Sequence, residues 1–409
     1  MIRLLLLGAT LSLSLGAAAA AAIAPVDRAA IEAYEVRLPA GPTAAPGAPP
    51  KTLAARMAEL KVPAVSVAFF ENGRVKWARA YGVAQAGGGQ AVTPQTLFQA
   101  ASMSKALAAV AALRLVEQGR LDLDGDVNGR LKAWTVPASD YTGEQKVTLR
   151  RLLSHTAGLT VSGFPGYAAG RPVPSTVQIL NGAPPSNTPA VRSFEAPGGA
   201  YAYSGGGFTV AQLLIEEAQG KPYPDVLQAL VLRPAGMRRS TFDQPLPARL
   251  ARRAASGHDS KGALILGARN TYPEYAAAGL WTTPSDYSRF MIALQDAYAG
   301  RPGVVLSQAS ARTMMTPVDA GYGLGVVLGR RGGHGYFQHS GSNMGFQCAS
   351  FAFLDGSRQG VVVMTNGDLG GRLAGEILSA LGDAYGWGPY DPANKVSPRR
   401  APMAPPSPR

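Results

Sequence analysis

The stretch that decides the fold is residues 96–116, TLFQAASMSKALAAVAALRLV, in which a polar turn leads directly into a long apolar run. Ser102 and Lys105 stand three residues apart, and no other serine in the chain is followed by a lysine at this spacing. On a helix, side chains three apart lie on one face, with about 5–6 Å between their Cβ atoms. A lysine amine at that distance can take the proton from a serine hydroxyl, which is otherwise a weak nucleophile. The stretch therefore predicts a buried helix that begins with a candidate nucleophile and its base.

Two further elements follow in the order that serine acyl-transfer chemistry requires. The first is residues 197–208, PGGAYAYSGGGF, a glycine-rich loop that carries Tyr203 and precedes a helical pattern. A tyrosine in such a loop can also be a packing residue, and the alternative is a phenol that reaches the Ser102 hydroxyl. The second element is residues 337–343, FQHSGSN, which we expect to precede a strand. Gly341 there would let a substrate lie against the strand edge and would expose a backbone N–H to an oxyanion.

Local signals predict strands at both ends of the folded body and helices between them. Runs 64–71 and 74–81 are rich in β-forming residues and flank Asn72-Gly73, a two-residue hairpin signal. Further strands are predicted over 322–328, 346–354 and 359–365. Helices are predicted over 149–154, 210–218, 225–232, 286–298 and 372–384. This order predicts one sheet, with a helical insertion between its strands.

The ordered elements resemble the three signatures of the serine β-lactamase and penicillin-binding protein superfamily. The resemblance is to its class C β-lactamase, DD-peptidase and family VIII esterase branch. Further likeness lies at LLSHTAGL (152–159), RPAGM (233–237), AGLWTT (278–283) and YGLG (322–325). It covers roughly residues 53–388, and the joint occurrence of ordered motifs makes it more specific than any one motif. The resemblance implies a β-lactamase/transpeptidase-like fold, an α/β (α+β) sandwich in which an antiparallel sheet flanked by helices is joined to a helical domain. The active site would lie between the sheet and the helical domain.

The same resemblance implies a role for each matching residue. Ser102 would be the nucleophile that forms an acyl-enzyme, Lys105 would take or steer its proton, and Tyr203 would act as general base and then protonate the leaving group. His339 would complete the catalytic set, the backbone N–H groups of Ser102 and Ser342 would form the oxyanion hole, and Ser340, Gly341 and Gly205 would contact substrate. Lysine and tyrosine stay alternative general bases, because their titrations are coupled.

Two positions depart from the pattern of the resembled lactamases. Gly205 stands where many class C enzymes carry an asparagine that holds the substrate's side-chain carbonyl. His339 stands where lactamases usually carry lysine, and we expect a protonated His339 to hold a substrate carboxylate; the alternative is a neutral ring that orients Tyr203. The substrate pool is D-amino-acid peptides, β-lactams and small esters. The alternative function is a catalytically silent penicillin- or peptidoglycan-binding sensor.

The composition limits the classes of partner and cofactor that we expect. The formal charge of +13 comes mostly from scattered arginines, and no nucleic-acid-binding signature accompanies it, so the expected partner is a small-molecule or peptide substrate and not nucleic acid. Peripheral attraction to an acidic cell envelope is the other consequence of this charge. No cofactor is expected, and no metal motif is present; the acidic run 122–126 reads as a solvated turn. The single cysteine, Cys348, is expected in the core.

The ends of the sequence predict export and loose flanks. Arg3, the apolar run 4–15 and the small residues that follow are typical of a secretory signal (1–22), cleaved near Ala20–Ala24, and the run is too short to span a membrane. We therefore expect a periplasmic or secreted protein with no integral membrane segment. A Pro/Ala-rich linker (23–52) and a disordered tail (389–409) are expected around the domain at 53–388, whose helical insertion spans roughly 106–284. Within it, the loop 162–194 is predicted either to border the site entrance or to be a surface excursion.

Overall fold

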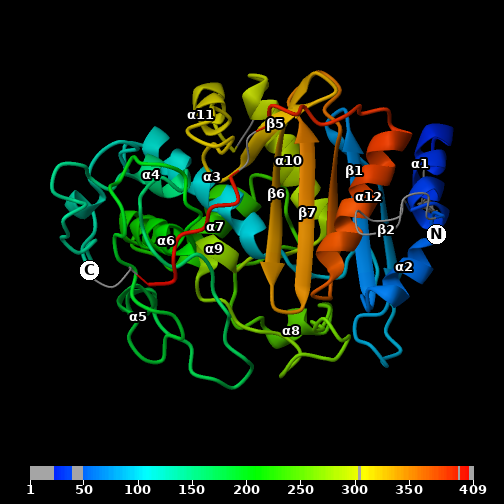
Figure 1. The fold of residues 1–409 in the computed structure, drawn as a ribbon, viewed down its shortest axis with the longest axis horizontal. Coiled ribbons are helices and arrows are strands. Elements are labelled where there is room, and N and C mark those ends of the chain that lie inside the picture. The colour runs from blue at the N-terminus through cyan, green and yellow to red at the C-terminus, as the bar shows by residue number, and fades with distance from the viewer. Residues whose placement is uncertain (1–22, 39–48, 303–304, 395–396, 405–409) are drawn as a thin grey trace, which may run out of the picture.

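A six-stranded antiparallel sheet forms the centre of one half of the molecule, as the computed structural model shows (Figure 1). The structure describes residues 23–38, 49–302, 305–394 and 397–404. The strand order is β2 (Arg74–Gly82), β1 (Ala64–Glu71), β8 (Gly360–Thr365), β7 (Phe346–Phe353), β6 (His334–Asn343) and β5 (Val327–Arg331). Strands from the two ends of the chain therefore meet at the β1–β8 pair.

The β1–β2 hairpin forms where the sequence predicts it. Asn72 and Gly73 both have positive φ, +50° and +77°, as a two-residue turn that matches the strand twist requires. The side chains of β1 alternate between the faces of the sheet: Val65, Val67 and Phe69 belong to one buried cluster, and Phe70 belongs to the other. The sheet is thus apolar on both faces, and each face needs a covering layer.

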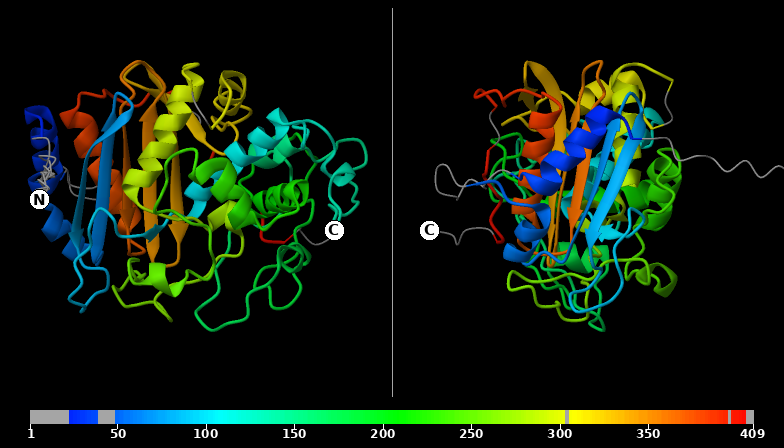
Figure 2. Two further views of the ribbon diagram at one scale, coloured as in Figure 1. Left: turned by 180° about the vertical axis from the view of Figure 1, so that it is seen from behind. Right: turned by 90° about the vertical axis from the view of Figure 1, so that its right-hand side faces the viewer.

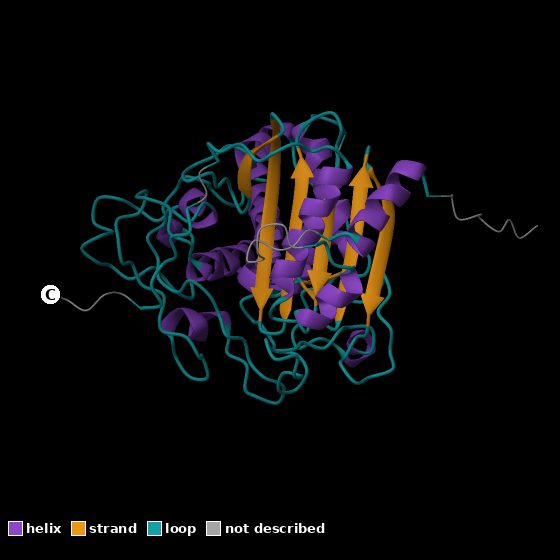
Figure 3. Cartoon of the chain, turned by 45° about the vertical axis from the view of Figure 1, so that its right-hand side comes forward, coloured by secondary structure: helices purple, strands orange, loops and turns teal. Residues whose placement is uncertain are grey.

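Helices supply these layers (Figures 2 and 3). α12 (Gly370–Ala384) and α1 (Pro25–Val36) cover one face, and α10 (Pro284–Tyr298) covers the other. α2 (Leu53–Glu59) is tied to α12 by a buried ion pair, in which the Arg56 guanidinium donates to both Glu376 carboxylate oxygens at 2.8 and 2.7 Å. The α10 start follows the sequence signal, because the Thr283 hydroxyl accepts from the Asp286 backbone N–H.

The other half of the molecule is helical and rich in loops. α3 (Ser104–Glu117) is buried at its centre and packs on α6 (Gly205–Gln219) and α9 (Tyr275–Ala278). A two-stranded ladder of β3 (Phe98–Gln99) and β4 (Trp281–Thr282) lies where this half joins the sheet. The remaining helices of this half and its border are α4 (Leu149–Leu153), α5 (Thr176–Asn181), α7 (Tyr223–Leu227), α8 (Ala248–Ala251) and α11 (Gln308–Met314). The predicted fold class, a helix-flanked antiparallel sheet plus a helical domain, is confirmed.

Three local expectations are corrected. Residues 337–343 precede the strand β7 as expected, but they also belong to a strand that the sequence did not predict, so His339, Ser340 and Gly341 lie inside β6. The predicted strand over 322–328 begins only at Val327, and residues 322–326 are a turn stabilised by bonds such as Gly323 N–H to Val326 O. Ser102 precedes α3 and lies in a 3₁₀ turn, Ala101–Met103.

Both flanks expected to be loose contain packed structure. Within the predicted linker 23–52, residues 25–36 form α1, in which Tyr34 is fully buried and Asp27 accepts a 2.7 Å hydrogen bond from the Tyr385 hydroxyl. Of the predicted tail, residues 389–394 and 397–404 are described, and Ala401 is buried. The predicted signal, 1–22, lies outside the described residues. In the part of the chain that the structure describes, no helix is long and apolar enough to cross a bilayer.

Candidate active site

Ser102 lies in a strained and tightly fixed turn. The preceding Ala101 has φ +48°, a left-handed conformation that costs a non-glycine residue about 1–2 kcal/mol. The Ser104 hydroxyl donates to the Ala101 carbonyl at 2.6 Å and accepts from the Leu280 backbone N–H at 3.0 Å. These bonds hold the turn between the sheet and the helical half, and the Ser102 side chain borders a cavity there.

Lys105 reaches Ser102 from the first turn of α3. Its Nζ atom lies 3.1 Å from Ser102 Oγ and 2.8 Å from the Ala277 carbonyl oxygen, and its side chain is buried. Burial lowers the pKa of Lys105, because desolvation disfavours the ammonium form; the nearby Tyr203 opposes this and Arg400 adds to it. A buried amine with a lowered pKa and a serine hydroxyl within hydrogen-bond distance is an arrangement suited to proton abstraction.

Tyr203 completes the group around Lys105. The Lys105 ammonium lies 4.9 Å from the centre of the Tyr203 ring. Tyr203 directly precedes Ser204, whose hydroxyl accepts from the Gly207 backbone N–H at 2.9 Å and so caps α6. The glycine-rich loop thus places Tyr203 beside Lys105 at the Ser102 cavity, and the expected contact of its phenol with the Ser102 hydroxyl stays a prediction.

His155, which lies in the family-like segment 152–159, packs against Tyr203. Its ring packs on Tyr203 with 4.3 Å between centres, and its Nδ1 atom accepts from the Ser204 backbone N–H at 3.0 Å. His155 has φ +60° and is fully buried, and desolvation holds its pKa well below the ordinary range. The ring is therefore neutral. Its contacts with the Tyr203 ring and the Ser204 backbone hold this part of the loop in place.

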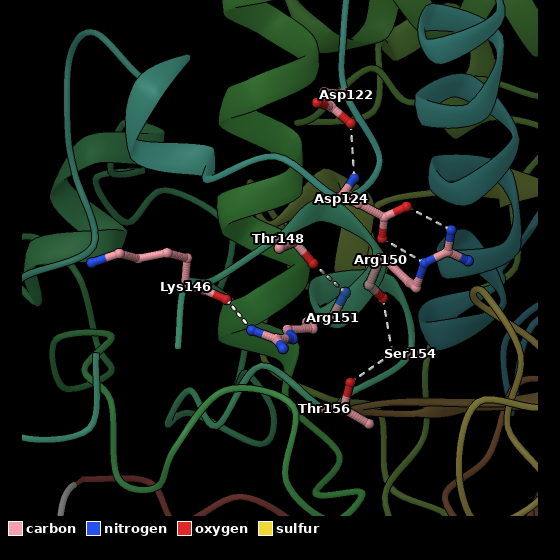
Figure 4. Close-up of polar contacts among 8 residues, drawn as sticks. All are labelled: Asp122, Asp124, Lys146, Thr148, Arg150, Arg151, Ser154 and Thr156. Atoms are coloured by element: carbon pink, nitrogen blue, oxygen red, sulfur yellow. Dashed lines mark hydrogen bonds and ion pairs between the residues drawn. The ribbon is translucent and has the colours of Figure 1, made fainter. Parts of the chain in front are cut away.

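The segment before His155 is fixed by a local polar network (Figure 4). The Thr148 hydroxyl caps α4 at the Arg151 backbone N–H, and Arg150 makes a bidentate ion pair with Asp124 at 2.7 and 2.8 Å. After α4, the Ser154 hydroxyl lies 2.9 Å from the Thr156 hydroxyl and donates to the Arg150 carbonyl. Asp122 and Asp124 are exposed, and the Asp124 backbone N–H donates to the Asp122 carboxylate at 3.0 Å, so the acidic run forms a solvated turn as the sequence predicts.

His339 does not carry the charge that the sequence suggested. Its Nε2 atom lies 3.0 Å from the Tyr322 hydroxyl, and its Nδ1 atom lies 2.6 Å from the Ser340 carbonyl oxygen. A carbonyl can only accept, so Nδ1 carries the proton and Nε2 accepts from Tyr322. Burial, and then the charge of Lys105, lower the pKa of His339 to about 3. The ring is neutral and bonds Tyr322, which corrects both expected roles, carboxylate binding by an imidazolium and direct orientation of Tyr203.

Gly341 contacts the nucleophile turn and not the substrate cavity. A Cβ atom on Gly341 would lie 2.2 Å from the Ala100 carbonyl oxygen and 2.5 Å from Cys348 Sγ. The predicted substrate contact at Gly341 is therefore corrected: the glycine lets β6 pass directly beneath the turn that holds Ser102. Cys348 is buried as predicted, with its thiol 3.0 Å from the Ala100 carbonyl.

Gly205 borders the cavity, and an aromatic ring occupies the place where a side chain would be. A Cβ atom on Gly205 would lie 2.7 Å from the Phe164 ring. Phe164 belongs to the loop 162–194, and Ser162, Gly163 and Phe164 all line the cavity. The first residues of this loop thus border the site, as one of the two sequence interpretations has it.

The cavity at Ser102 has a volume of about 380 Å³. It brings together Ser102, Lys105, Tyr203, His339, Ser340, Ser342 and Gly205 from the sequence-predicted set, and adds Tyr201, Tyr322, Asn343, Arg399 and Arg400. Two larger cavities, of about 880 and 860 Å³, lie elsewhere and contain no serine–lysine pair. The serine–lysine pair, and not the cavity volume, therefore identifies the candidate site.

Comparison with known proteins agrees with this geometry. A family model described as beta-lactamase matches residues 50–384 of the 409. The chain belongs to the β-lactamase family. One relative of the chain, Esterase EstB of Burkholderia gladioli, is 33% identical over 190 residues. These residues are 44% of this chain and 47% of the esterase. Penicillin-binding protein 4 of Amycolatopsis lactamdurans is 28% identical over 78% of the chain and 87% of its own length.

A solved structure supports the same fold. The octameric penicillin-binding protein homologue from Pyrococcus abyssi aligns with a TM-score of 0.67 and 24% sequence identity. The alignment covers 82% of this chain and 76% of the Pyrococcus chain. The match to EstB spans about half the length of that relative. Family membership and fold are thus established.

Three residues at the site escaped the sequence analysis as functional candidates. His155 lies in the family-like segment 152–159, and Tyr322 begins the strand predicted over 322–328. Arg400 lies in the predicted tail, where nothing in the local sequence places it near Ser102. Its position depends on a contact with Tyr203, almost 200 residues earlier.

Proposed function

We propose that this protein is an exported serine hydrolase that cleaves amide or ester bonds through an acyl-enzyme on Ser102. The observation that carries the proposal is the 3.1 Å contact between Ser102 Oγ and the buried Lys105 amine. The cause of the lowered lysine pKa is desolvation, which keeps part of the amine in its basic form nearer to neutral pH. Such an amine can accept the serine proton as Oγ attacks.

Acylation then proceeds through a tetrahedral intermediate. Ser102 Oγ forms a bond to the carbonyl carbon while its proton passes to the Lys105–Tyr203 pair, and the carbonyl oxygen becomes an oxyanion. We assign the backbone N–H groups of Ser102 and Ser342 as oxyanion donors, because both residues border the cavity. Collapse of the tetrahedral intermediate expels the amine or alcohol, which takes a proton from Tyr203.

Deacylation reverses these roles with water as the nucleophile. The Lys105–Tyr203 pair takes a proton from water, and the hydroxide attacks the acyl carbon and releases an acid and free Ser102. The Lys105 Nζ atom lies 4.9 Å from the centre of the Tyr203 ring, so both side chains are placed to act on the same water.

The relatives' names support the substrate pool. One is called an esterase and another a penicillin-binding protein, so D-amino-acid peptides, β-lactams and small esters form the proposed set. The neutral His339 and the missing asparagine at 205 favour peptide and ester substrates over efficient lactam hydrolysis.

The test is intact-protein mass spectrometry combined with turnover. Purified protein is incubated with benzylpenicillin, an N-acyl-D-alanyl-D-alanine and a nitrophenyl ester, and adduct mass and product release are followed together. A transient adduct with continuing release supports the hydrolase. A permanent stoichiometric adduct with every compound would instead indicate the silent sensor. Ser162→Ala, which changes a cavity serine without a lysine partner, is the matched control.

Export is a separate part of the proposal. It rests on Arg3, the apolar run 4–15 and the small residues before Ala24. N-terminal sequencing of protein from the native host should begin near Ala21–Ala24 in a periplasmic or secreted fraction. A retained Met1 in cytosolic protein would refute export.

A further inference from the structure

Residues 397–403 lie across the edge of the Ser102 cavity and are seated by backbone hydrogen bonds. The Tyr203 backbone N–H donates to the Arg399 carbonyl at 3.0 Å, and the Ala401 N–H donates to the Tyr203 carbonyl at 2.9 Å. Arg400 thus pairs with Tyr203 as a short parallel bridge. The red trace in Figure 1 shows this segment running across the helical half.

Further contacts on both sides of the bridge fix this segment. Arg399 forms an ion pair with Glu195, and one of its guanidinium nitrogens also donates to the Ala200 carbonyl at 3.3 Å. The Val161 backbone N–H donates to the Pro402 carbonyl at 2.8 Å, and Ala401 is buried. These contacts fix the segment in place, and its residues 397–400 line the cavity.

Arg400 is an exposed cation of this segment, as Arg399 is, but it differs from Arg399 in its partners. Its guanidinium carbon lies 5.5 Å from the centre of the Tyr203 ring. Among the described residues no carboxylate lies within ion-pair distance of Arg400, whereas the adjacent Arg399 is paired. No aspartate or glutamate of the described chain lines the cavity. Arg400 thus borders a cavity that no described carboxylate lines, and its guanidinium has no ion-pair partner among the described residues.

The other basic groups at the site cannot serve as an anion anchor. Lys105 is buried and is engaged by Ser102 and the Ala277 carbonyl. His339 donates to the Ser340 carbonyl and accepts from Tyr322, so its ring is neutral. Arg400 is left as the group that can bind two carboxylate oxygens at once.

We propose that Arg400 anchors a substrate carboxylate on the leaving-group side of the scissile amide or ester bond. This assignment rests on the proposed function, in which Tyr203 protonates the leaving group. Because Arg400 lies against Tyr203, an anion bound by Arg400 belongs to that side of the bond. The preferred substrates are then acyl compounds whose departing amine, alcohol or thiol carries a free carboxylate.

The experiment compares two matched thioesters. One is the thioester of N-benzoylglycine with thioglycolic acid, which carries a leaving-group carboxylate, and the other is its methyl ester. Arg400→Gln should lower kcat/KM for the acid about 10–100-fold more than for the methyl ester, mainly through KM, since a charged hydrogen-bonded contact is lost. Arg400→Lys should retain an intermediate preference. Arg252→Gln removes an exposed arginine away from the cavity and should change neither substrate's kinetics.

Two results would overturn the assignment. One is an equal fall for acid and methyl ester in Arg400→Gln, which would mean a purely structural wall. The other is an unchanged preference for the acid. A neutral fluorophosphonate is applied to the same proteins as a separate readout: labelling of Ser102 in wild type and variants keeps the proposed function even if Arg400 fails, whereas an unlabelled wild type removes the proposed function itself.

Discussion

Gly341 lies so close to Ala100 that a Cβ atom at position 341 would come within 2.2 Å of the Ala100 carbonyl oxygen. The strand that carries His339 and the turn that carries Ser102 are therefore held in backbone contact. Gly341→Ala must push them apart, and we expect a loss of about 1–3 kcal/mol in unfolding free energy and at least a tenfold loss of kcat. Urea denaturation and ester hydrolysis measure the two effects.

The matched control for Gly341→Ala is Gly335→Ala. Gly335 lies in the same strand, and a Cβ atom there would have no neighbour within 4 Å. Equal stability and activity in the two alanine variants would show that the close approach of β6 to the turn is unimportant.

The buried Lys105 should make stability depend on pH. Its folded-state pKa lies below the unfolded value of about 10.4, so between these two values the unfolded chain binds more protons, and stability rises with pH. Lys105→Met removes this term and also the proposed base. We expect activity to be lost, and the stability difference between variant and wild type to shift in favour of wild type as pH rises through this window. Denaturation at a series of pH values measures it, and parallel curves would contradict a lowered lysine pKa.

His339 should contribute no ionisation to the rate between pH 5 and 8. Its pKa in the folded protein is about 3, so the ring is already neutral throughout this range. Because the unfolded value is about 6.5, His339 lowers stability progressively as pH falls from 6.5 toward 3. His339→Asn should reduce the acid sensitivity of unfolding, measured against wild type. An imidazolium signal from His339 in NMR spectra at pH 6 would contradict this account.

His155 should act on catalysis through the position of Tyr203. His155→Ala removes the ring that packs on Tyr203 and leaves the Ser204 N–H without its acceptor, so we expect kcat to fall at least tenfold with little change in KM. His155→Asn should recover part of the rate, because an asparagine oxygen can accept from Ser204 and asparagine tolerates a φ of +60°. Steady-state kinetics of both variants decide between positioning and simple core packing; equal defects in kcat would favour packing.

Sequence reasoning succeeded where the determining interactions are local. The Ser102/Lys105 spacing and the Asn72-Gly73 turn involve neighbours in the chain, so their geometry follows from backbone rules. The charge state of His339 depends on burial and on Lys105, which belong to the assembled fold. The same holds for α1, whose Tyr34 packs against Trp77 and Tyr81 of β2, and for Arg400, which reaches the site through a bridge to Tyr203.

The central claim is that Ser102 is the acylated nucleophile. The most direct measurement is peptide mass spectrometry after reaction with a fluorophosphonate, in wild type and in Ser102→Ala. We expect a single adduct on the peptide that carries Ser102, with no adduct and no hydrolysis in the variant. An adduct on Ser104 or Ser204, or undiminished turnover in Ser102→Ala, would contradict it.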